Sequence, residues 1–329
     1  GGGDLRNFII DGDFTQWPDG TAARTMVGGV YNSALLRAAA DHDGTVTGER
    51  STDVPTVAES NHNSQYSALY KCTGTDSSIG AAQYARIAYR VTGTDFAYIH
   101  KQQVTLSFWA KTAAANSGDT YYIKLTNSAY NRSYIQNFAP TSSWTKFTFT
   151  ITLDSSGTWL FTEADIGLRI IFTLASGSDY DDGTIGSWVG TNEEWASGTA
   201  ISNFLDSTSN EFYISQLSLV LGSSAPSGFL GEPISTVRSQ MAWYVERWDF
   251  EDEANENGIT AGGFTYNATT SMHTMLYPEK RIKPNITFSG SGTYNVYYNG
   301  GTTDTTSHGA DLLGRQGCRI IAYTASVLT

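Results

Sequence analysis

The sequence predicts an all-β protein: an antiparallel jelly-roll sandwich followed by a linker helix and a small C-terminal β domain. Runs in which apolar and polar residues alternate recur through the first 222 residues, as strands with one buried face require. Turn clusters rich in Gly, Ser and Asp separate these runs, for example at 116–119 and 176–179. A small-residue segment at 222–228 then leads into a single apolar stripe at helical spacing.

Five runs have the clearest strand pattern, because their apolar residues fall at every second position and therefore share one face. The run 144–153 is the clearest, since Lys146 and three threonines occupy the other face. Trp109 is an exception, because it lies on the otherwise polar side of its strand. The apolar rows, in chain order, are Ala85, Ile87, Tyr89 and Val91; Val104, Leu106, Phe108 and Ala110; Phe147, Phe149, Ile151 and Leu153; Ile166, Leu168, Ile170, Phe172 and Leu174; and one face of 212–221.

The pattern changes after residue 222. Pro233 and Ser235 can start a helix. Its apolar stripe is Val237, Met241, Tyr244, Val245 and Trp248. Short strands are expected again at 285–288, 294–298 and 319–323. These observations predict a start at 1–5, a sandwich at 6–222, a linker with a helix at 223–258 and a small β domain at 259–329. A tail of about 70 residues is marginal alone, so we expect it to pack on the first domain or on copies of itself.

Charge and cysteine content exclude several classes of protein. The chain has 329 residues, with 20 Lys and Arg against 32 Asp and Glu, which gives a net charge of −12. This acidity argues against nucleic acid and anionic membrane as partners. No apolar run approaches the roughly 18 residues of a membrane-spanning helix, so we expect no membrane insertion. Cys72 and Cys318 are too few for a disulfide framework, and unpaired core thiols are favoured over a single bridge. The five histidines show no zinc-ligand spacing.

The chain resembles jelly-roll modules of the carbohydrate-binding type, as they occur in tail-fibre and tail-associated proteins of bacteriophages. The resemblance spans about 7–250 and rests on Asn7–Phe14 with Trp17, Val104–Lys111, Trp144–Thr148, Ser156–Trp159, Ala175–Ser178, Trp195–Gly198 and Phe212–Leu217. The first of these segments resembles the opening strand of such modules and the last resembles their closing strand. The segment 241–247 resembles a short helix that follows the module, and 281–288 resembles a strand of a small C-terminal head.

The resemblance also implies a structural calcium ion, which many such modules hold between the opening strand and an acidic pair in the closing strand. Asp11 and Asp13 are the candidate ligands, although Ser215 and Gln216 stand where the acidic pair is expected. No acidic cluster in the chain satisfies the EF-hand loop. Turn formation is therefore an alternative role for these aspartates, and no other cofactor is expected.

Carbohydrate recognition uses aromatic faces for stacking and polar side chains for the sugar hydroxyls. The strand pattern predicts one such face, made of Trp109, Tyr122, Arg132, Tyr134 and Gln136. The loop 180–195 is a second candidate site through Tyr180, Trp188 and Trp195. The alternatives are that a loop or domain covers the predicted face, and that the loop tryptophans only attach an acidic loop to the core.

No pattern in the sequence indicates an enzyme. There is no Gly-x-Ser-x-Gly nucleophile turn, no glycine-rich phosphate loop, and no carboxylate pair that stands out among 32 acidic residues. The resemblance instead implies non-catalytic adhesion to bacterial cell-surface polysaccharide by a tail fibre or appendage of an extracellular virion. We expect a homo-oligomer, as a trimer, together with other virion proteins as partners. The alternatives are a purely structural virion protein and an accessory of a glycan depolymerase.

Overall fold

The computed structural model describes residues 6–31, 35–190, 195–198, 201–245, 263–288, 295–298 and 301–324. The chain divides into two compact units, residues 1–238 and residues 239–329. The first unit contains a β sandwich and the second a smaller β sheet. None of the helices in the described ranges is long and apolar enough to cross a membrane.

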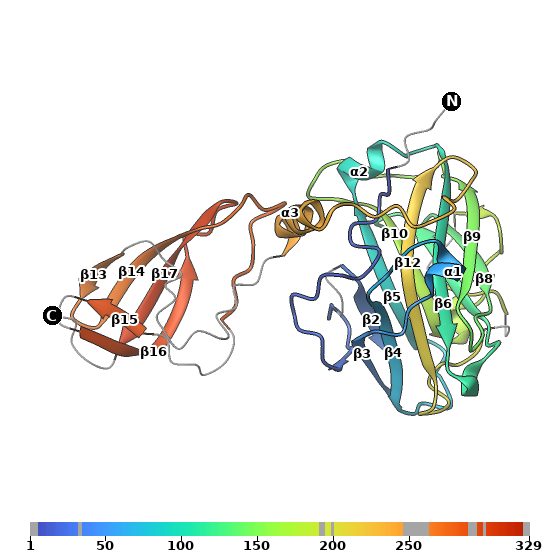
Figure 1. Ribbon diagram of the computed structural model, residues 1–329, viewed down its shortest axis with the longest axis horizontal. Helices are drawn as coiled ribbons and strands as arrows, with labels where there is room; N and C mark the ends of the chain where they lie inside the picture. The colour runs from blue at the N-terminus through green and yellow to red at the C-terminus, as the bar shows by residue number, and fades with distance from the viewer. Residues whose placement is uncertain are drawn as a thin grey trace. The chain divides into compact units, whose positions relative to one another are not determined.

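The first unit is an antiparallel jelly-roll sandwich of two six-stranded sheets, as the sequence predicts (Figure 1). Sheet A has the strand order β1-β3-β4-β12-β6-β9, and sheet B has the order β11-β8-β7-β10-β5-β2. The strands of sheet A are β1 (Arg24–Thr25), β3 (Thr45–Ser51), β4 (Ser67–Gly74), β6 (Gln103–Thr112), β9 (Thr145–Thr152) and β12 (Glu211–Leu221). The strands of sheet B are β2 (Arg37–Asp41), β5 (Tyr84–Thr92), β7 (Tyr121–Thr126), β8 (Ser133–Phe138), β10 (Ile166–Ser176) and β11 (Trp188–Val189).

The core between the sheets is built from the predicted apolar rows. The Phe108 ring of β6 lies edge-on to Phe172 of β10, with 4.9 Å between centroids. The ring centroids of Phe147 in β9 and Phe138 in β8 are 5.3 Å apart, so these two strands meet along one edge of the sandwich. Alternation along the strands sends every second side chain into this core. The predicted inner faces are therefore confirmed.

Two short helices of the first unit were not predicted. Helix α1 (Val57–Ser60) begins at a capping box in which Thr56 and Glu59 each accept from the other's backbone amide. Helix α2 (Gly93–Ala97) begins at Thr92 and lies at one end of the sandwich (Figure 1). Both are too short for a periodic apolar stripe, which is the main sequence signal for a helix. Two 3₁₀ turns, η1 (Ala114–Asn116) and η2 (Ser178–Tyr180), lie in connections.

The segment 7–14, predicted to be the opening strand, forms turns instead. Asp11 and Phe14 both have φ of 54°, which breaks the extended conformation that a strand needs. The segment still follows β12, since the Phe8 amide donates to the Leu219 carbonyl at 2.9 Å. Gly12 makes this approach possible, because a Cβ there would lie 1.9 Å from the Leu217 carbonyl oxygen. The backbone of Gly12 accepts a hydrogen bond from the Leu217 amide at 2.8 Å.

The small-residue linker is anchored to the outer face of sheet A. Lys146 of β9 donates its ammonium to the Pro226 carbonyl at 2.9 Å, and Thr105 of β6 donates to the Gly222 carbonyl at 2.8 Å. Helix α3 (Ile234–Tyr244) follows, and the Thr236 amide donates to the Pro233 carbonyl, so the predicted start is confirmed. The predicted stripe continues to Trp248, which lies outside the described residues.

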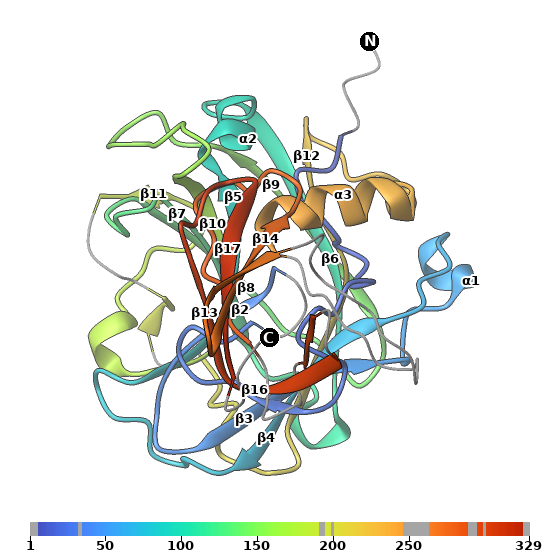
Figure 2. The same ribbon diagram turned by 90° about the vertical axis from the view of Figure 1, so that its left-hand side faces the viewer.

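The second unit is a five-stranded antiparallel sheet in the order β13-β14-β17-β16-β15, whose strands are labelled in Figure 1 and four of which are labelled again in Figure 2. Its strands are β13 (Gly263–Asn267), β14 (Thr270–Leu276), β15 (Asn295–Tyr298), β16 (Gly301–Asp311) and β17 (Gly317–Thr324). The strands expected at 294–298 and 319–323 are confirmed. The strand expected at 285–288 is wrong, because this segment is irregular. Its Ile286 and Phe288 instead pack on a small core that includes Met275 and Tyr277.

Both cysteines are buried and unpaired, as predicted. Cys72 belongs to the core of the sandwich, whereas Cys318 belongs to the small core of the second unit. Burial raises the pKa of each thiol. Each cysteine therefore acts as a small apolar side chain.

Candidate functional site

The single sugar-binding face predicted from strand alternation does not exist, because its five residues occupy three places. Tyr134 and Gln136 pair with the core residues Leu125 and Ile123, so they lie on the inner side of sheet B. Tyr122 pairs with Asn137 on the outer side of the same sheet. Trp109 lies in the other sheet, on the outer face of sheet A beside Ser215, and is 8% exposed. Alternation correctly groups the residues that share one side within each strand. It cannot show whether that side of a strand faces the core or the solvent, so residues from different strands were placed on one face in error.

Three of the predicted residues form a packed group on the outer face of sheet B, here called the outer-face cluster: Tyr122, Tyr180 and Trp195. Trp195 is fully buried against Ala88 and Ile171. The Tyr122 hydroxyl donates to the Ser197 carbonyl at 3.2 Å. Both contacts hold the segment 195–198 on the sheet, which is the packing alternative considered for the loop tryptophans.

The remaining four residues meet where β8 and β11 lie side by side, here called the edge cluster: Arg132, Tyr134, Gln136 and Trp188. Trp188 pairs with Tyr134 across the two strands, and their rings lie 5.7 Å apart. The Trp188 ring nitrogen donates to the Thr152 carbonyl at 2.8 Å, and Trp159 packs edge-on at 5.8 Å. All four side chains are half-buried. The edge cluster thus joins residues from the two sites that the sequence suggested separately.

Polar groups surround the aromatic pair of the edge cluster. Arg132 is held by an ion pair in which its Nε donates to Asp154. Gly157, at φ +81°, leaves space for this arginine, because a Cβ there would lie 2.5 Å from the Arg132 Cγ. Gln136 donates to Asn137 at 3.1 Å, and burial raises the pKa of Tyr134 above its ordinary value. The cluster therefore offers two aromatic faces, an amide, a guanidinium and a phenol hydroxyl.

Asp154 is the residue of this site that the sequence reasoning missed. It lies in Asp154–Gly157, which reads as a turn, and its Oδ1 does accept from the Ser156 amide at 2.9 Å. Only the fold brings its second oxygen to Arg132, 22 positions earlier in the chain. An arginine and a turn aspartate 22 positions apart form no recognisable sequence motif, so the sequence does not reveal this ion pair.

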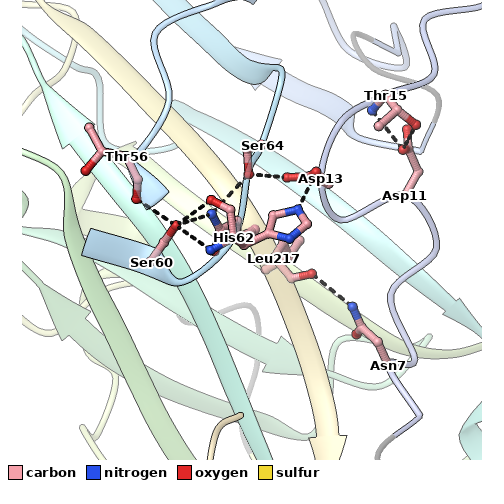
Figure 3. Close-up of polar contacts among 10 residues, drawn as sticks. Asn7, Asp11, Asp13, Thr15, Thr56, Ser60, His62, Ser64 and Leu217 are labelled. Carbon is pink, nitrogen blue, oxygen red and sulfur yellow. Dashed lines mark hydrogen bonds and ion pairs between the residues drawn. The ribbon is translucent and has the colours of Figure 1, made fainter. Parts of the chain in front are cut away.

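The two candidate calcium ligands have separate protein partners (Figure 3). The Asp11 carboxylate accepts from the amides of Thr15 and Gln16, each at 2.8 Å. The Asp13 carboxylate pairs with His62 Nε2 at 2.9 Å and accepts from the Ser64 hydroxyl at 2.5 Å. Each of the four carboxylate oxygens therefore already interacts with a protein group. Within the described ranges, no three His, Cys, Asp or Glu side chains gather as metal ligands would.

Burial shifts both carboxylates toward the neutral form. Desolvation is the largest cause that raises the pKa of Asp11, to about 6, and it also raises the pKa of Asp13 against the hydrogen bonds from Ser64 and His62. A calcium site requires oxygen ligands that converge on one point, whereas these two carboxylates bind separate protein groups. Asp11 and Asp13 in this arrangement do not fit a calcium ion.

The same polar network does not form a nucleophilic site. Ser64 and His62 both bind the carboxylate of Asp13, so the imidazole does not stand between the hydroxyl and the acid, as activation of a serine requires. Gln216 donates to Ser64 and Ser60 at 3.0 Å each, which links the bulge in β12 to the loop around α1. The network therefore attaches the segments 7–16 and 56–64 to sheet A.

No protein-family model and no curated protein sequence matches the chain. Its structure is similar to the enzymatically active domain of tailspike protein 4 of bacteriophage CBA120, with 11% identity and a TM-score of 0.33. That match covers 60% of this chain but only 21% of the tailspike chain. It is also similar to TmCBM61 in complex with β-1,4-galactotriose, with 10% identity, a TM-score of 0.33, and coverage of 66% of this chain and 99% of that one.

A third similar structure is the family 11 carbohydrate-binding module of the cellulosomal cellulase Lic26A-Cel5E of Clostridium thermocellum. The identity is 12% and the TM-score 0.33, over 63% of this chain and 98% of the module. These values are too low to transfer a function. The candidate site therefore depends on its own geometry.

Proposed function

We propose that this protein is a non-catalytic glycan-binding protein and that the edge cluster is its binding site. The observation that carries the proposal is the Tyr134–Trp188 pair, which is half-buried and has an amide and a guanidinium beside it. Sugar C–H groups stack on such rings while polar side chains bind the hydroxyls. The hydrogen bond from Trp188 to Thr152 and the ion pair of Arg132 hold the groups before a ligand arrives. Preorganisation of this kind reduces the entropy lost on binding.

The proposal extends to adhesion of a virion to bacterial cell-surface polysaccharide. Its support is the sequence resemblance to tail-fibre and tail-associated proteins. A single edge cluster gives weak affinity, and several copies in an oligomer raise it through effective concentration. A trimer formed through α3 and the second unit would supply those copies, and other virion proteins would hold it on an extracellular particle.

A structural role in the virion is the second candidate. The covering of Trp195 and Tyr122 favours it, because two aromatic side chains expected to bind sugar instead pack against the chain itself. In that case the edge cluster would contact a virion protein rather than a glycan.

A glycan array with the intact protein separates these candidates. Bacterial surface polysaccharides and plant β-glycans are probed with wild type and with Trp188→Ala, Tyr134→Ala and Trp144→Ala. Trp144 is the matched control, since it is also a half-buried tryptophan but lies by sheet A, where its ring nitrogen donates to Asp53. We expect the two edge variants to lose at least tenfold in affinity for any bound glycan, which is about 1.4 kcal/mol. The Trp144 variant should retain the affinity of wild type.

Two results would contradict the proposal. One is binding that survives both edge variants, which would place the glycan elsewhere on the protein. The other is the absence of binding to any glycan by a correctly folded protein, which would favour the structural role. Recovery of bound oligosaccharides with shortened chains would contradict the non-catalytic part.

A further inference from the structure

Five cationic side chains gather on the outer face of sheet B, although the chain has a net charge of −12. Strand pairing places Arg169 of β10 directly across from Arg90 of β5, and Arg37 of β2 across from Ala88. Alternation puts all members of the group on the side away from the core. They are Arg37, Arg86, Arg90, Lys124 and Arg169. Within the described strands of this sheet, Asp41 is the one carboxylate on that side, and it lies exposed at the far end of β2.

Arg169 lies at the centre of this charge and is almost fully buried, with 7% of its surface exposed. Its Nη2 donates to the Ser128 carbonyl at 3.4 Å, while its buried Nε has no acceptor among the described residues. Desolvation is the largest cause that lowers the pKa of Arg169. The Tyr130 hydroxyl group raises this pKa, and the charges of Arg90, Arg37 and Arg86 lower it further. A buried guanidinium among like charges is strongly stabilised by an anion.

Aromatic rings and further polar groups border the arginines. The Arg86 guanidinium lies 3.6 Å from the centre of the Trp195 ring, and that of Arg169 lies 4.5 Å from the centre of the Tyr130 ring. The Trp195 ring nitrogen and the Thr173 hydroxyl are also buried, and neither has a hydrogen-bond partner in the part of the chain that the structure describes. The face thus combines donors, positive charge and rings.

The arginines on the side of this face toward β5 and β2 are partly exposed. Arg37, Arg86 and Arg90 are half-buried, whereas Tyr122 and Lys124, nearer β8, are fully buried. The arginine patch is defined here as Arg37, Arg86, Arg90 and Arg169. It lies on the outer side of sheet B, whereas Tyr134 and Gln136 of the edge cluster lie on the inner side.

We propose that the arginine patch is a second binding site, which takes the carboxylate of an acidic saccharide such as a uronate. A planar guanidinium binds a carboxylate through two parallel hydrogen bonds, and several of them discriminate strongly against a neutral group of the same shape. The adjacent Tyr130 and Tyr84 rings suit the attached sugar ring. The saccharide part of this inference rests on the proposed function, whereas the anion part rests on the patch alone.

The test compares two forms of one probe, an oligogalacturonate and its fully methyl-esterified form, by titration calorimetry with the intact protein. The ester keeps the sugar chain but removes the charge. We expect the acid form to bind at least tenfold more tightly, and added salt to weaken only the acid form. Arg37→Gln and Arg90→Gln should each reduce acid binding at least tenfold. Arg24→Gln is the matched control, because this exposed arginine lies in β1 of the other sheet and pairs with Asp19.

Thermal unfolding of each variant checks that a lost affinity is not lost folding, and Arg37 on the edge strand β2 is the safer of the two positions. Equal binding of acid and ester, no binding of the acid, or arginine variants that behave like Arg24→Gln would overturn the inference. Displacement of the acid by sulfate at equal concentration would overturn the saccharide class and leave a plain anion site. Acid binding that survives Trp188→Ala, in a protein that binds no neutral glycan, would support the patch while contradicting the edge site.

Discussion

The edge cluster and the outer-face cluster contain the same kinds of side chain but differ in what covers them. In the edge cluster, Tyr134 and Trp188 are half-buried at the margin of the core. In the outer-face cluster, the segment 195–198 covers the sheet, so that Trp195 and Tyr122 are fully buried. The difference teaches that an aromatic residue on a polar strand face is equally compatible with recognition and with packing, and that the covering segment decides between them.

The largest expected effect tests whether Trp195 is a packing residue. Trp195→Ala should lower the free energy of unfolding by about 3–5 kcal/mol, because it removes a fully buried indole and leaves a cavity. Trp188→Ala removes a half-buried indole and one hydrogen bond, and we expect a loss of only about 1–2 kcal/mol. Urea unfolding of the sandwich measures both values. Equal losses in the two variants would break the comparison.

A change of pH distinguishes the two aromatic clusters from the buried carboxyl of Asp11. The aromatic rings of both clusters keep one charge state between pH 4 and pH 7, so their contribution to stability should not depend on pH there. Asp11 does not keep one charge state, since its pKa is raised to about 6 in the folded protein. The folded state therefore holds more protons than the unfolded state between about pH 4 and 6. The contribution of Asp11 to stability is fully present below pH 4 and declines as the pH rises through 6.

We therefore expect the stability of wild type relative to Asp11→Asn to fall by up to about 3 kcal/mol between pH 4 and pH 7. The loss caused by Trp195→Ala should be the same at both pH values. Urea unfolding at pH 4 and pH 7 measures the difference in free energy of unfolding between wild type and each of the two variants. A relative stability of Asp11→Asn that does not change with pH would contradict the raised pKa.

The tyrosine hydroxyls offer a smaller test of the same contrast. Tyr122→Phe removes a buried hydrogen bond to the Ser197 carbonyl, and we expect a loss of about 1 kcal/mol. Burial is the one cause that raises the pKa of Tyr134, with no hydrogen bond contributing, so Tyr134→Phe should leave stability within about 0.5 kcal/mol of wild type. Its effect should appear in glycan affinity instead. A destabilising Tyr134→Phe without any change in affinity would assign that residue to packing.

The smallest expected effect concerns calcium. A chelator should leave the melting temperature and the glycan affinity unchanged, because every oxygen of Asp11 and Asp13 interacts with a protein group. Differential scanning calorimetry with calcium and with chelator measures this. A calcium-dependent rise in melting temperature would contradict this expectation.

Sequence reasoning predicted the inner faces of β5, β6, β9, β10 and β12 but not the inner face of β8. The row from Phe147 to Leu153 faces the core as expected. In β8, however, Ile135 is buried on the outer side while Tyr134 is half-buried on the inner side. Alternation alone therefore gave no reliable inside and outside for this strand, and the register with β7 decided it.

The sequence named the four residues of the edge cluster as binding residues, but it divided them between two separate sites. Arg132, Tyr134 and Gln136 do share one side of a strand, and Trp188 joins them from a loop about 50 positions away. That meeting depends on the pairing of β11 with β8, a two-residue contact that local sequence does not encode. The arginine patch was missed because its residues alternate with apolar ones in β5, β10 and β2 and appear as ordinary solvent-facing positions.

The hydrogen bonds between the segment 7–14 and β12 place the two ends of the sandwich side by side. The Leu219 amide donates to the Asn7 side chain at 2.9 Å, across 212 positions of sequence. A domain whose ends are adjacent tolerates circular permutation and insertion into a loop of another protein, because neither end must cross the fold. The same contact closes the largest loop in the sandwich, so it should form late during folding.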